Sequence, residues 1–198
     1  MALTFDAEHP DRPWCPPGNA ERVLDVLAAE GLHATVFVQG RWAEAYPGTA
    51  RRIADEGHLV GHHSHYHARM PLLTDDGLVS DIEDAARAIT AATGADPRPW
   101  FRCPFGAGAN DPRVLDALAR LGYRNVHWHV ELEDWEPART GEAIAADGIE
   151  GVRRHGDGAV VLLHTWPGGT AEGLPALIEG VRALGATFVT VDELEVLP

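Results

Sequence analysis

The sequence predicts an α/β protein built on a parallel β-sheet. Three observations lead to this fold class. Short apolar runs alternate with longer stretches of helical periodicity along the whole chain, no linker or low-complexity segment interrupts them, and polar residues directly follow several of the runs. With 198 residues the chain can bury a substantial core without disulfide or metal staples. We therefore expect a single domain over residues 1–198.

Seven apolar runs are candidate strands. The clearest is the run Ala-Val-Val-Leu-Leu at residues 159–163, which has the length and apolar character of a buried strand. In chain order, the expected strands are residues 2–5, 34–38, 58–60, 100–101, 124–130, 159–163 and 187–191.

Helical periodicity fills the segments between these strands. A helix is expected from about Asn19, and a second passes through residues 51–54. Thr74 is the expected N-cap of the next helix, whose first turn carries Asp75 and Asp76, where the helix dipole favours anions. Further helices are expected from about residue 111, after the acidic residues that follow the fifth strand, and around residues 174–181.

Both a closed parallel barrel and an open, doubly wound sheet fit this alternation. No Gly-x-Gly-x-x-Gly turn follows the first strand, which argues against the dinucleotide-binding version of the open sheet. The alternation alone leaves the barrel and the open sheet as alternatives.

The composition excludes several classes of function. A formal charge of −14 argues against nucleic acid and anionic membranes as partners, because both call for a basic surface. All sixteen basic residues are arginine, which rules out a Schiff-base lysine and a P-loop lysine. Ser64 and Ser80 are the only serines and lie outside any Gly-x-Ser-x-Gly elbow. Cys15 and Cys103 are too few for a disulfide framework or a zinc–thiolate site.

The first residues predict a strand and lack the basic and apolar regions of a signal peptide. No apolar run approaches the length of a membrane span. We expect a cytoplasmic protein as the chain is given, or a secreted one if the chain is a domain whose export segment has been removed. No feature of the sequence indicates an oligomeric state.

Four of the eleven histidines fall within six residues, from His62 to His67. Imidazole is the commonest metal ligand among side chains. His63 and His67 lie one helical turn apart if the segment is helical, whereas His63, His65 and His67 share a face if it is extended. Either geometry gives a convergent pair. Loop histidines bonded to the backbone would give the same pattern.

Polar residues also stand at positions that a parallel barrel would bring together. Because the carboxyl ends of all barrel strands lie on one face, side chains that follow the strands would surround one mouth. These residues are Asp6 after the first expected strand, His63 and His67 after the third, Arg102 after the fourth, Glu131, Glu133 and Asp134 after the fifth, and His164 after the sixth.

Five short motifs in this order resemble those of the polysaccharide deacetylases, the NodB-homology carbohydrate esterases of family 4. They are Thr4-Phe5-Asp6, His63-Ser64-x-x-His67, Arg102-x-Pro104-x-Gly106, Asp134-Trp135 and Leu162-x-His164. One such motif is weak, but five in order are specific. The resemblance implies a distorted (β/α)7 barrel, formed by a single NodB-homology domain, and metal-dependent hydrolysis of an N- or O-acetyl group on a carbohydrate substrate.

The resemblance also implies a divalent metal, most readily Zn²⁺, with Co²⁺ or Mn²⁺ as alternatives. His63, His67 and one carboxylate would hold it and leave a position open for water. The family usually has Asp-Asp at the end of the first strand, with the second as ligand, but here that position is Ala7. Glu8 is the expected substitute, because residues two apart in an extended segment point the same way and Glu8 shares a face with Asp6. Without Glu8, the site would have two histidines and water, or no metal.

The resemblance assigns four further residues to proton transfer, two that move the proton and two that pair with them. Asp6 is the expected general base, and Arg102 would pair with it and favour its ionised form. His164 would protonate the leaving amine or alcohol, while Asp134 would hold the far nitrogen of His164.

Three residues are expected to contact the acyl group. The backbone N–H of Phe105 would stabilise the oxyanion together with the metal, and Trp135 and Leu162 would line an apolar slot for the methyl group. Besides Ala7, three positions depart from the usual family pattern, and one of them is Phe105, which replaces the usual tyrosine but leaves the proposed N–H donor intact. Cys103 stands where the family usually has proline, and Glu131 stands where it usually has aspartate.

Alternative functions remain at this stage. The same fold could hydrolyse a non-carbohydrate C–N bond, in a formyl group or a cyclic ureide. Because Ala7 replaces the usual ligand, a non-catalytic carbohydrate- or metal-binding barrel is a second alternative. A thiolate of Cys103 with His164 as base is a third, but it would leave His63 and His67 unused.

Overall fold

The computed structural model describes residues 1–9, 15 and 17–194. The chain forms two compact units. Among the described residues, the first unit comprises residues 1–6, 15, 17–35 and 128–194, and the second comprises residues 7–9 and 36–127. Within these residues, no helix combines the length and apolar character that a membrane crossing requires.

The strands of the first unit are β1 (Ala2–Ala7), β6 (Val130–Glu131) and β7 (Val160–His164). Only the last residue of β1 belongs to the second unit. β1 pairs with β7 in parallel, and β6 pairs in parallel with β7 as well. Every residue of β1 and β7 is buried, as their apolar runs predict. The register sets Asp6 opposite His164 where both strands approach their carboxyl ends.

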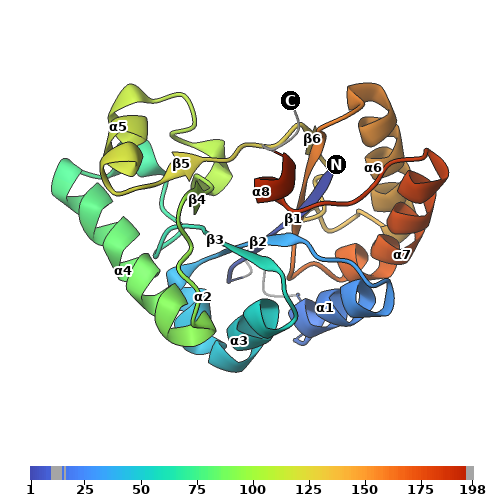
Figure 1. The fold of residues 1–198 in the computed structure, drawn as a ribbon, viewed down its shortest axis with the longest axis horizontal. Coiled ribbons are helices and arrows are strands. Elements are labelled where there is room, and N and C mark those ends of the chain that lie inside the picture. Colours follow the sequence, from blue (N-terminus) through green and yellow to red (C-terminus); the bar gives the residue numbers. More distant parts are fainter. Residues whose placement is uncertain (10–14, 16, 195–198) are drawn as a thin grey trace. The chain divides into compact units, whose positions relative to one another are not determined.

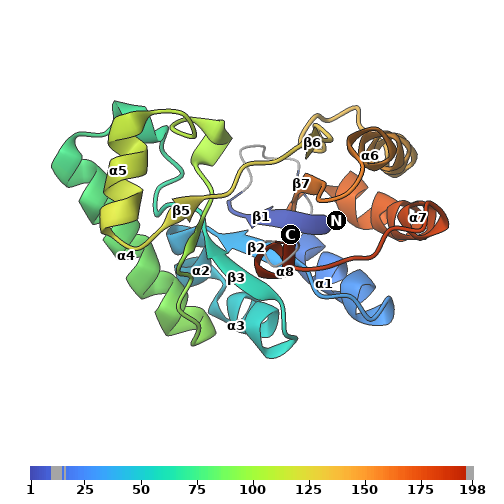
Figure 2. The same cartoon turned by 45° about the horizontal axis from the view of Figure 1, so that its top comes forward.

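The helices of the first unit are α1 (Asn19–Ala29), α6 (Gly141–His155), α7 (Gly168–Ala183) and the short α8 (Val191–Leu194). α6 and α7 run side by side, and α1 packs against α7 (Figures 1 and 2). Gly173 permits the close contact between α6 and α7, because a Cβ at this position would lie 2.3 Å from the carbonyl oxygen of Gly141.

The strands of the second unit are β2 (Thr35–Val38), whose first residue belongs to the first unit, β3 (Leu59–His62), β4 (Trp100–Phe101) and β5 (Arg124–Asn125). They lie in the order β5-β4-β3-β2, and β4 is parallel to both β3 and β5. The helices are α2 (Gly40–Ala45), α3 (Pro47–Asp55), α4 (Asp75–Thr93), α5 (Pro112–Arg120) and the 3₁₀ turns η1 (Met70–Leu72) and η2 (Pro104–Gly106).

The core of the second unit lies between its strands and helices α4 and α5 (Figure 2). Phe101 of β4, Ile82 of α4 and Leu118 of α5 are all buried there. The cap expected at Thr74 is present, since its side chain accepts a hydrogen bond from the N–H of Gly77. α4 therefore starts where the sequence predicts, with its first turn fixed.

Residues 124–130 do not form the single strand that their pattern predicts. They contain β5 and β6, which are separated by residues 126–129. The backbone changes partner within this segment: the N–H of Val126 bonds to the carbonyl of Phe101, whereas the N–H of His129 bonds to that of Val160. A strand needs one continuous partner, so the β-favouring composition of the segment is not sufficient here.

The strand predicted at residues 187–191 is also wrong. This segment has no assigned strand, and Val191 begins α8. Among the described residues, its backbone bonds near β1 are made at Met1, which precedes that strand, donates to the carbonyl of Thr187 and accepts from the N–H of Val189. Because β1 itself starts at Ala2, the segment meets β1 at its very end and finds no further residues with which to continue a ladder.

Candidate active site

One carboxylate and two imidazoles meet in the second unit. Glu8 follows β1, and His63 and His67 follow β3. Oε2 of Glu8 lies 2.5 Å from Nε2 of His67 and 3.3 Å from Nε2 of His63. One ligand atom from each residue lies within 4.8 Å of the other two. The structure therefore brings together the three residues that were predicted as metal ligands.

The tautomer of His63 is set by the carbonyl of Arg102. Nδ1 of His63 lies 2.9 Å from this carbonyl oxygen, which can only accept a hydrogen bond. Nδ1 therefore carries the proton, and Nε2 presents a lone pair toward Glu8. Glu8 and His63 are buried, at 2% and 1% exposure. A buried lone pair that faces a buried carboxylate favours a cation between them.

The donor set fits a divalent metal. Two imidazole nitrogens and one carboxylate oxygen form the three-ligand set of many catalytic zinc sites, which keep a further position for water. His67 is partly buried, whereas Glu8 is almost fully buried. No other group of three such side chains among the described residues comes as close together.

Gln39 fixes the backbone on both sides of Glu8. Its N–H donates to the carbonyl of Ala7 at 2.9 Å, and its side-chain Oε1 accepts from the N–H of His9 at 3.0 Å. Ala7 is completely buried and its methyl group cannot bind a metal. The carboxylate at this point of the chain comes from Glu8, as the alternation along an extended segment predicts.

The segment that joins His63 to His67 is neither helical nor extended, so both predicted geometries are wrong. β3 ends at His62, and Ser64 and His67 have φ angles of 63° and 57°. Non-glycine residues rarely occupy this left-handed region, and each costs about 1–3 kcal/mol. His65 is not part of the ligand set, and its ring packs against that of Tyr66 at 4.6 Å between centroids.

Asp81 of α4 holds this segment in place. Its Oδ2 accepts hydrogen bonds from Oγ of Ser64 at 2.7 Å and from the N–H of His65 at 2.8 Å, and its Oδ1 accepts from the N–H of Tyr66 at 3.1 Å. Oγ of Ser64 in turn accepts from the N–H of His67 at 3.2 Å. The position of one ligand therefore depends on a carboxylate fourteen residues further along the chain.

The sequence contained a signal for Asp81 that the motif search did not use. Asp81 follows Leu78 by three residues and directly precedes Ile82, so it falls in the apolar stripe of α4. It is 4% exposed. A carboxylate at such a position needs several hydrogen-bond donors nearby, which makes it a candidate for holding a loop.

A second group of polar side chains lies in the first unit, at the end of β7. Nδ1 of His164 lies 2.7 Å from Oδ1 of Asp134, so the expected contact between these residues is present. Oδ2 of Asp134 accepts from the N–H of His164 at 2.8 Å and from Oγ1 of Thr170 at 2.6 Å. The carboxylate thus fixes the imidazole ring, and Nε2 is left as the nitrogen that can move a proton. The sequence analysis missed Thr170, which stands outside the five motifs.

Residues 1–126 match a family model whose description is polysaccharide deacetylase. The chain belongs to the polysaccharide deacetylase family. The family inferred from the five motifs is thereby confirmed. One relative, peptidoglycan-N-acetylmuramic acid deacetylase PdaA of Bacillus subtilis (strain 168), is 31% identical over 193 residues, which are 97% of this chain and 70% of the relative.

Solved structures extend this likeness to the fold. A family 4 acetyl xylan esterase from Clostridium thermocellum, in complex with a cobalt ion, is 31% identical with a TM-score of 0.84, over 99% of this chain and 90% of that chain. A family 4 pseudoenzyme from Bacillus anthracis is 26% identical with a TM-score of 0.84, over 98% of this chain and 64% of that chain. The predicted fold class, a distorted (β/α)7 barrel, is confirmed.

Arg102 and Phe105, which belong to the third deacetylase motif, lie in the second unit. Arg102 is completely buried, its Nε donates to the carbonyl of Val126 at 3.3 Å, and its guanidinium carbon lies 4.1 Å from the centre of the Phe37 ring. Phe105 has a φ of 57° and its side chain is exposed, with its ring 4.4 Å from that of His67. The pairing of Arg102 with Asp6 and the oxyanion role of the Phe105 N–H stay predictions.

Cys103 does not suit the role of a thiolate nucleophile. It is 1% exposed, and this burial raises the pKa of its thiol to about 12. The thiolate is the nucleophilic form, so almost none is present near neutral pH. The cysteine-hydrolase alternative is therefore wrong for this deacetylase-family chain.

The apolar slot expected from Trp135 and Leu162 stays a prediction. A pocket of about 200 Å³ in the first unit is lined by Trp135, Trp166 and Asp134, among other residues. The rings of both tryptophans contact His164, at centroid distances of 5.3 and 5.8 Å. Leu162 is not part of this lining, because it lies within β7 and is 3% exposed.

Glu131, the other departure from the family pattern, lies on β6 opposite Leu162. It is exposed and lines a separate pocket of about 500 Å³ in the first unit, together with His129 and His155. This carboxylate is therefore turned to a surface other than the pocket beside His164.

Proposed function

We propose that this chain is a metal-dependent hydrolase that removes an N- or O-acetyl group from a carbohydrate. The observation that supports the proposal is the close approach of Glu8, His63 and His67, which could together hold a metal ion although Ala7 replaces the usual aspartate. Membership of the polysaccharide deacetylase family supplies the reaction class. The relatives act, by their names, on N-acetylmuramic acid or on N-acetylglucosamine in peptidoglycan.

The metal we propose is Zn²⁺, with Co²⁺ or Mn²⁺ as substitutes. Such an ion, when bound, polarises an acyl oxygen and lowers the pKa of water so that hydroxide is available near neutral pH. The protein would contribute three ligands, of which Glu8 and His63 are almost fully buried. The carbonyl of Arg102 accepts from Nδ1 of His63 and so leaves Nε2 as the lone-pair nitrogen, while Asp81 acts through the hydroxyl of Ser64 to hold the backbone of His67.

Asp6 and His164 are proposed to move protons, as general base and general acid. They lie opposite each other in the register of β1 and β7, and both are buried, at 3% and 8% exposure. Asp134 holds Nδ1 of His164, so Nε2 would give its proton to the leaving amine or alcohol. Thr170 donates to the same carboxylate and restrains its rotation.

Two further roles concern the acyl group. The N–H of Phe105 would donate to the oxyanion, and the left-handed backbone at this residue sets the direction in which that N–H points. Trp135, beside His164, would cover the acetyl methyl group. The expected pairing of Arg102 with Asp6 is part of the proposal.

The test measures acetate released from acetylated chito-oligosaccharide and from peptidoglycan fragments by the purified protein. We expect turnover that a chelator abolishes and Zn²⁺ or Co²⁺ restores. His164→Ala should abolish turnover with its metal content unchanged, whereas His63→Ala should lose both. The matched control is His33→Ala, which removes a histidine outside both groups. Full activity in the presence of chelator would contradict the proposal.

A second candidate function is a non-catalytic carbohydrate- or metal-binding protein. It is favoured by the replacement at Ala7 and by the likeness to a pseudoenzyme of the same family. Saturable binding of the sugar without acetate release would support it. The remaining alternative is a hydrolase of another C–N bond. Hydrolysis of formylated or cyclic ureide substrates, without release of acetate from acetylated sugars, would support it.

A further inference from the structure

Two exposed arginines lie beside the candidate metal ligands. Several arginine side chains of the second unit form ion pairs with carboxylates, such as Arg87 with Asp84 and Arg113 with Asp75. Arg41 and Arg69 are exposed, and neither forms such a pair within the part of the chain that the structure describes. Acidic residues outnumber basic ones by 30 to 16, so two exposed arginines beside one candidate site form a local concentration of positive charge.

Arg69 instead lies over an aromatic ring that touches a metal ligand. Its guanidinium carbon is 4.4 Å from the centre of the Phe105 ring, and the Phe105 ring is 4.4 Å from that of His67. Phe105 is 48% exposed. Arg69, Phe105 and His67 therefore form a continuous series of contacts from solvent to the candidate metal site.

Arg41 makes a similar but looser arrangement. Its guanidinium carbon lies 5.9 Å from the centre of the Tyr66 ring, and Tyr66 directly precedes His67. Tyr66 is 60% exposed. The backbone of Arg41 is fixed by its N–H, which donates to the carbonyl of His65 at 3.3 Å. We call Arg41, Tyr66, Arg69 and Phe105 the cationic rim.

A stacked guanidinium can still bind an anion. Stacking occupies its face, while its N–H groups point outward from the edge in a fork that matches both oxygens of a carboxylate. A hydrogen bond between such charged groups is about twice as strong as a neutral one. The overall charge of −14 repels anions, so positive groups at this place counteract the repulsion where an anionic substrate would arrive.

We propose that the cationic rim binds a carboxylate of the substrate, and that the preferred substrate is therefore an acetylated sugar that carries a carboxylate. Arg69 is the principal contact and Arg41 the secondary one. Phe105 and Tyr66 hold the two guanidinium groups and offer faces on which a sugar ring can stack. The inference rests on the proposed function, because it names the substrate class of the same site.

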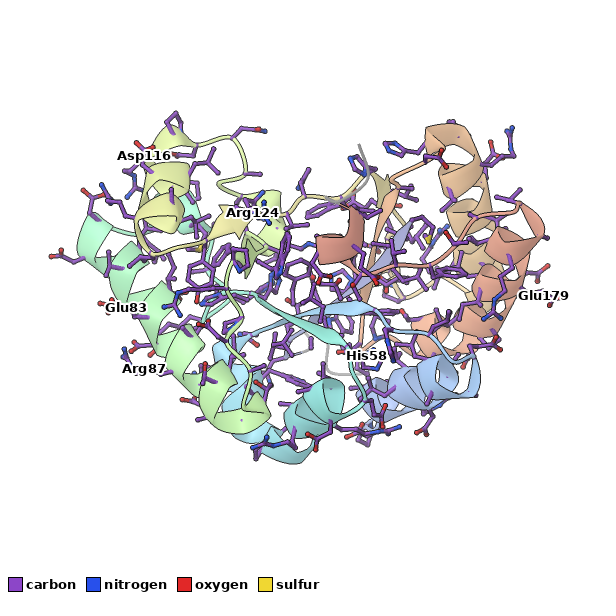
Figure 3. All side chains as sticks on the ribbon, in the orientation of Figure 1. His58, Glu83, Arg87, Asp116, Arg124 and Glu179 are labelled. Atoms are coloured by element: carbon purple, nitrogen blue, oxygen red, sulfur yellow. The ribbon has the colours of Figure 1, made fainter. Side chains whose placement is uncertain are left out.

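The test compares two oligosaccharides of equal length that differ in the carboxylate, one containing N-acetylmuramic acid and one containing only N-acetylglucosamine. The variants are Arg69→Gln and the matched control Arg87→Gln. Both change the net charge equally, but Arg87 lies on the outer face of α4, away from the strands (Figure 3). Both arginines are exposed, so neither variant should impair folding.

For the wild-type protein, we expect a higher kcat/KM for acetate release from the acidic sugar, with a preference that declines as salt is added. Arg69→Gln should lower kcat/KM for the acidic sugar by about tenfold and change that for the neutral sugar less than about twofold. Arg87→Gln should change neither. An equal loss on both sugars, or a wild-type preference for the neutral sugar, would overturn the inference.

Binding measurements keep the inference testable if neither sugar is hydrolysed. Calorimetric titration of the zinc-loaded protein with each sugar then gives the two dissociation constants. Tighter binding of the acidic sugar that depends on Arg69 would support the cationic rim while the proposed hydrolysis fails. Equal binding of the two sugars, or binding unaffected by Arg69→Gln, would refute it.

Discussion

His63 and His164 each have Nδ1 engaged by a neighbour, and the neighbour decides what Nε2 can do. Nδ1 of His63 meets a neutral backbone carbonyl, whereas Nδ1 of His164 meets the carboxylate of Asp134. A neutral partner suits a ring that must offer a lone pair to a metal. An anionic partner suits a ring that carries a proton during the reaction. Two histidines of equal intrinsic chemistry are thus suited to different roles, one as the proposed metal ligand and one as the proposed general acid.

This difference predicts the effect of Asp134→Asn. The amide keeps the size of the side chain but removes the charge and disturbs the proton position on His164, so kcat should fall by about 10²-fold or more. KM and bound zinc should change little. Steady-state kinetics and metal analysis check this, with Asp147→Asn, an exposed partner of Arg139, as the control. An unchanged kcat would show that His164 needs no carboxylate.

At the scale of elements, α4 holds the segment that carries the candidate metal ligands His63 and His67. The carboxylate of Asp81 accepts hydrogen bonds from the hydroxyl of Ser64 and from the N–H groups of the next two residues, in a segment that is neither helix nor strand. The left-handed residues Ser64 and His67 are costly, and three hydrogen bonds to one buried carboxylate offset that cost. A rigid helix therefore determines where a loop ligand stands.

Asp81→Asn should weaken zinc binding by about tenfold to a hundredfold, the usual range for residues that orient a ligand. The amide turns an N–H₂ group toward donors that need an acceptor. Competition with a chromophoric chelator measures the affinity, and the visible spectrum of the Co²⁺ form reports the ligand geometry. The spectrum should change in the variant.

Two controls separate positioning from general destabilisation. Asp84→Asn removes a carboxylate that pairs with Arg87 on the same helix, and Ile82→Val costs about 0.5–1.5 kcal/mol in the core. Both should keep the zinc affinity and the Co²⁺ spectrum of the wild-type protein. Zinc affinity that falls equally in Ile82→Val and Asp81→Asn would mean that Asp81 acts through stability alone.

At the scale of the whole molecule, the metal would join distant parts of the chain. Glu8 comes from its beginning, whereas His63 and His67 come after β3. Such a set exists only in the folded state, so binding adds to the free energy of unfolding. The free energy of unfolding therefore reports metal binding at this site independently of enzymatic activity.

Zinc at a concentration of 100 times its Kd should raise the free energy of unfolding by about 2.7 kcal/mol. For a chain of this size, Tm should then rise by roughly 5–10 °C. Scanning calorimetry with added zinc, and again after a chelator, checks the effect. Glu8→Gln should show a much smaller rise. An equal rise in the variant would mean that zinc stabilises the protein at another place.

Several parts of the fold and the site were predictable because they depend on local periodicity. The start of the first helix at Asn19 and the cap at Thr74 follow from short-range chemistry. Glu8 could be chosen over Ala7 because alternation along an extended segment is a property of the backbone itself. The separation of β5 from β6 was not predictable, since it depends on the strands that each segment meets.

The sequence by itself determined the alternation of strands and helices, the family, and which residue types follow each strand. The tertiary structure decided the rest: the left-handed turns at Ser64 and His67, the support from Asp81 and Thr170, and the absence of a strand at residues 187–190 in the described chain. The physical reason is the sequence separation over which each interaction acts. Periodicity and caps depend on neighbours within a few residues, whereas a buried polar group or a β-ladder is stable only when a partner from a distant segment is present.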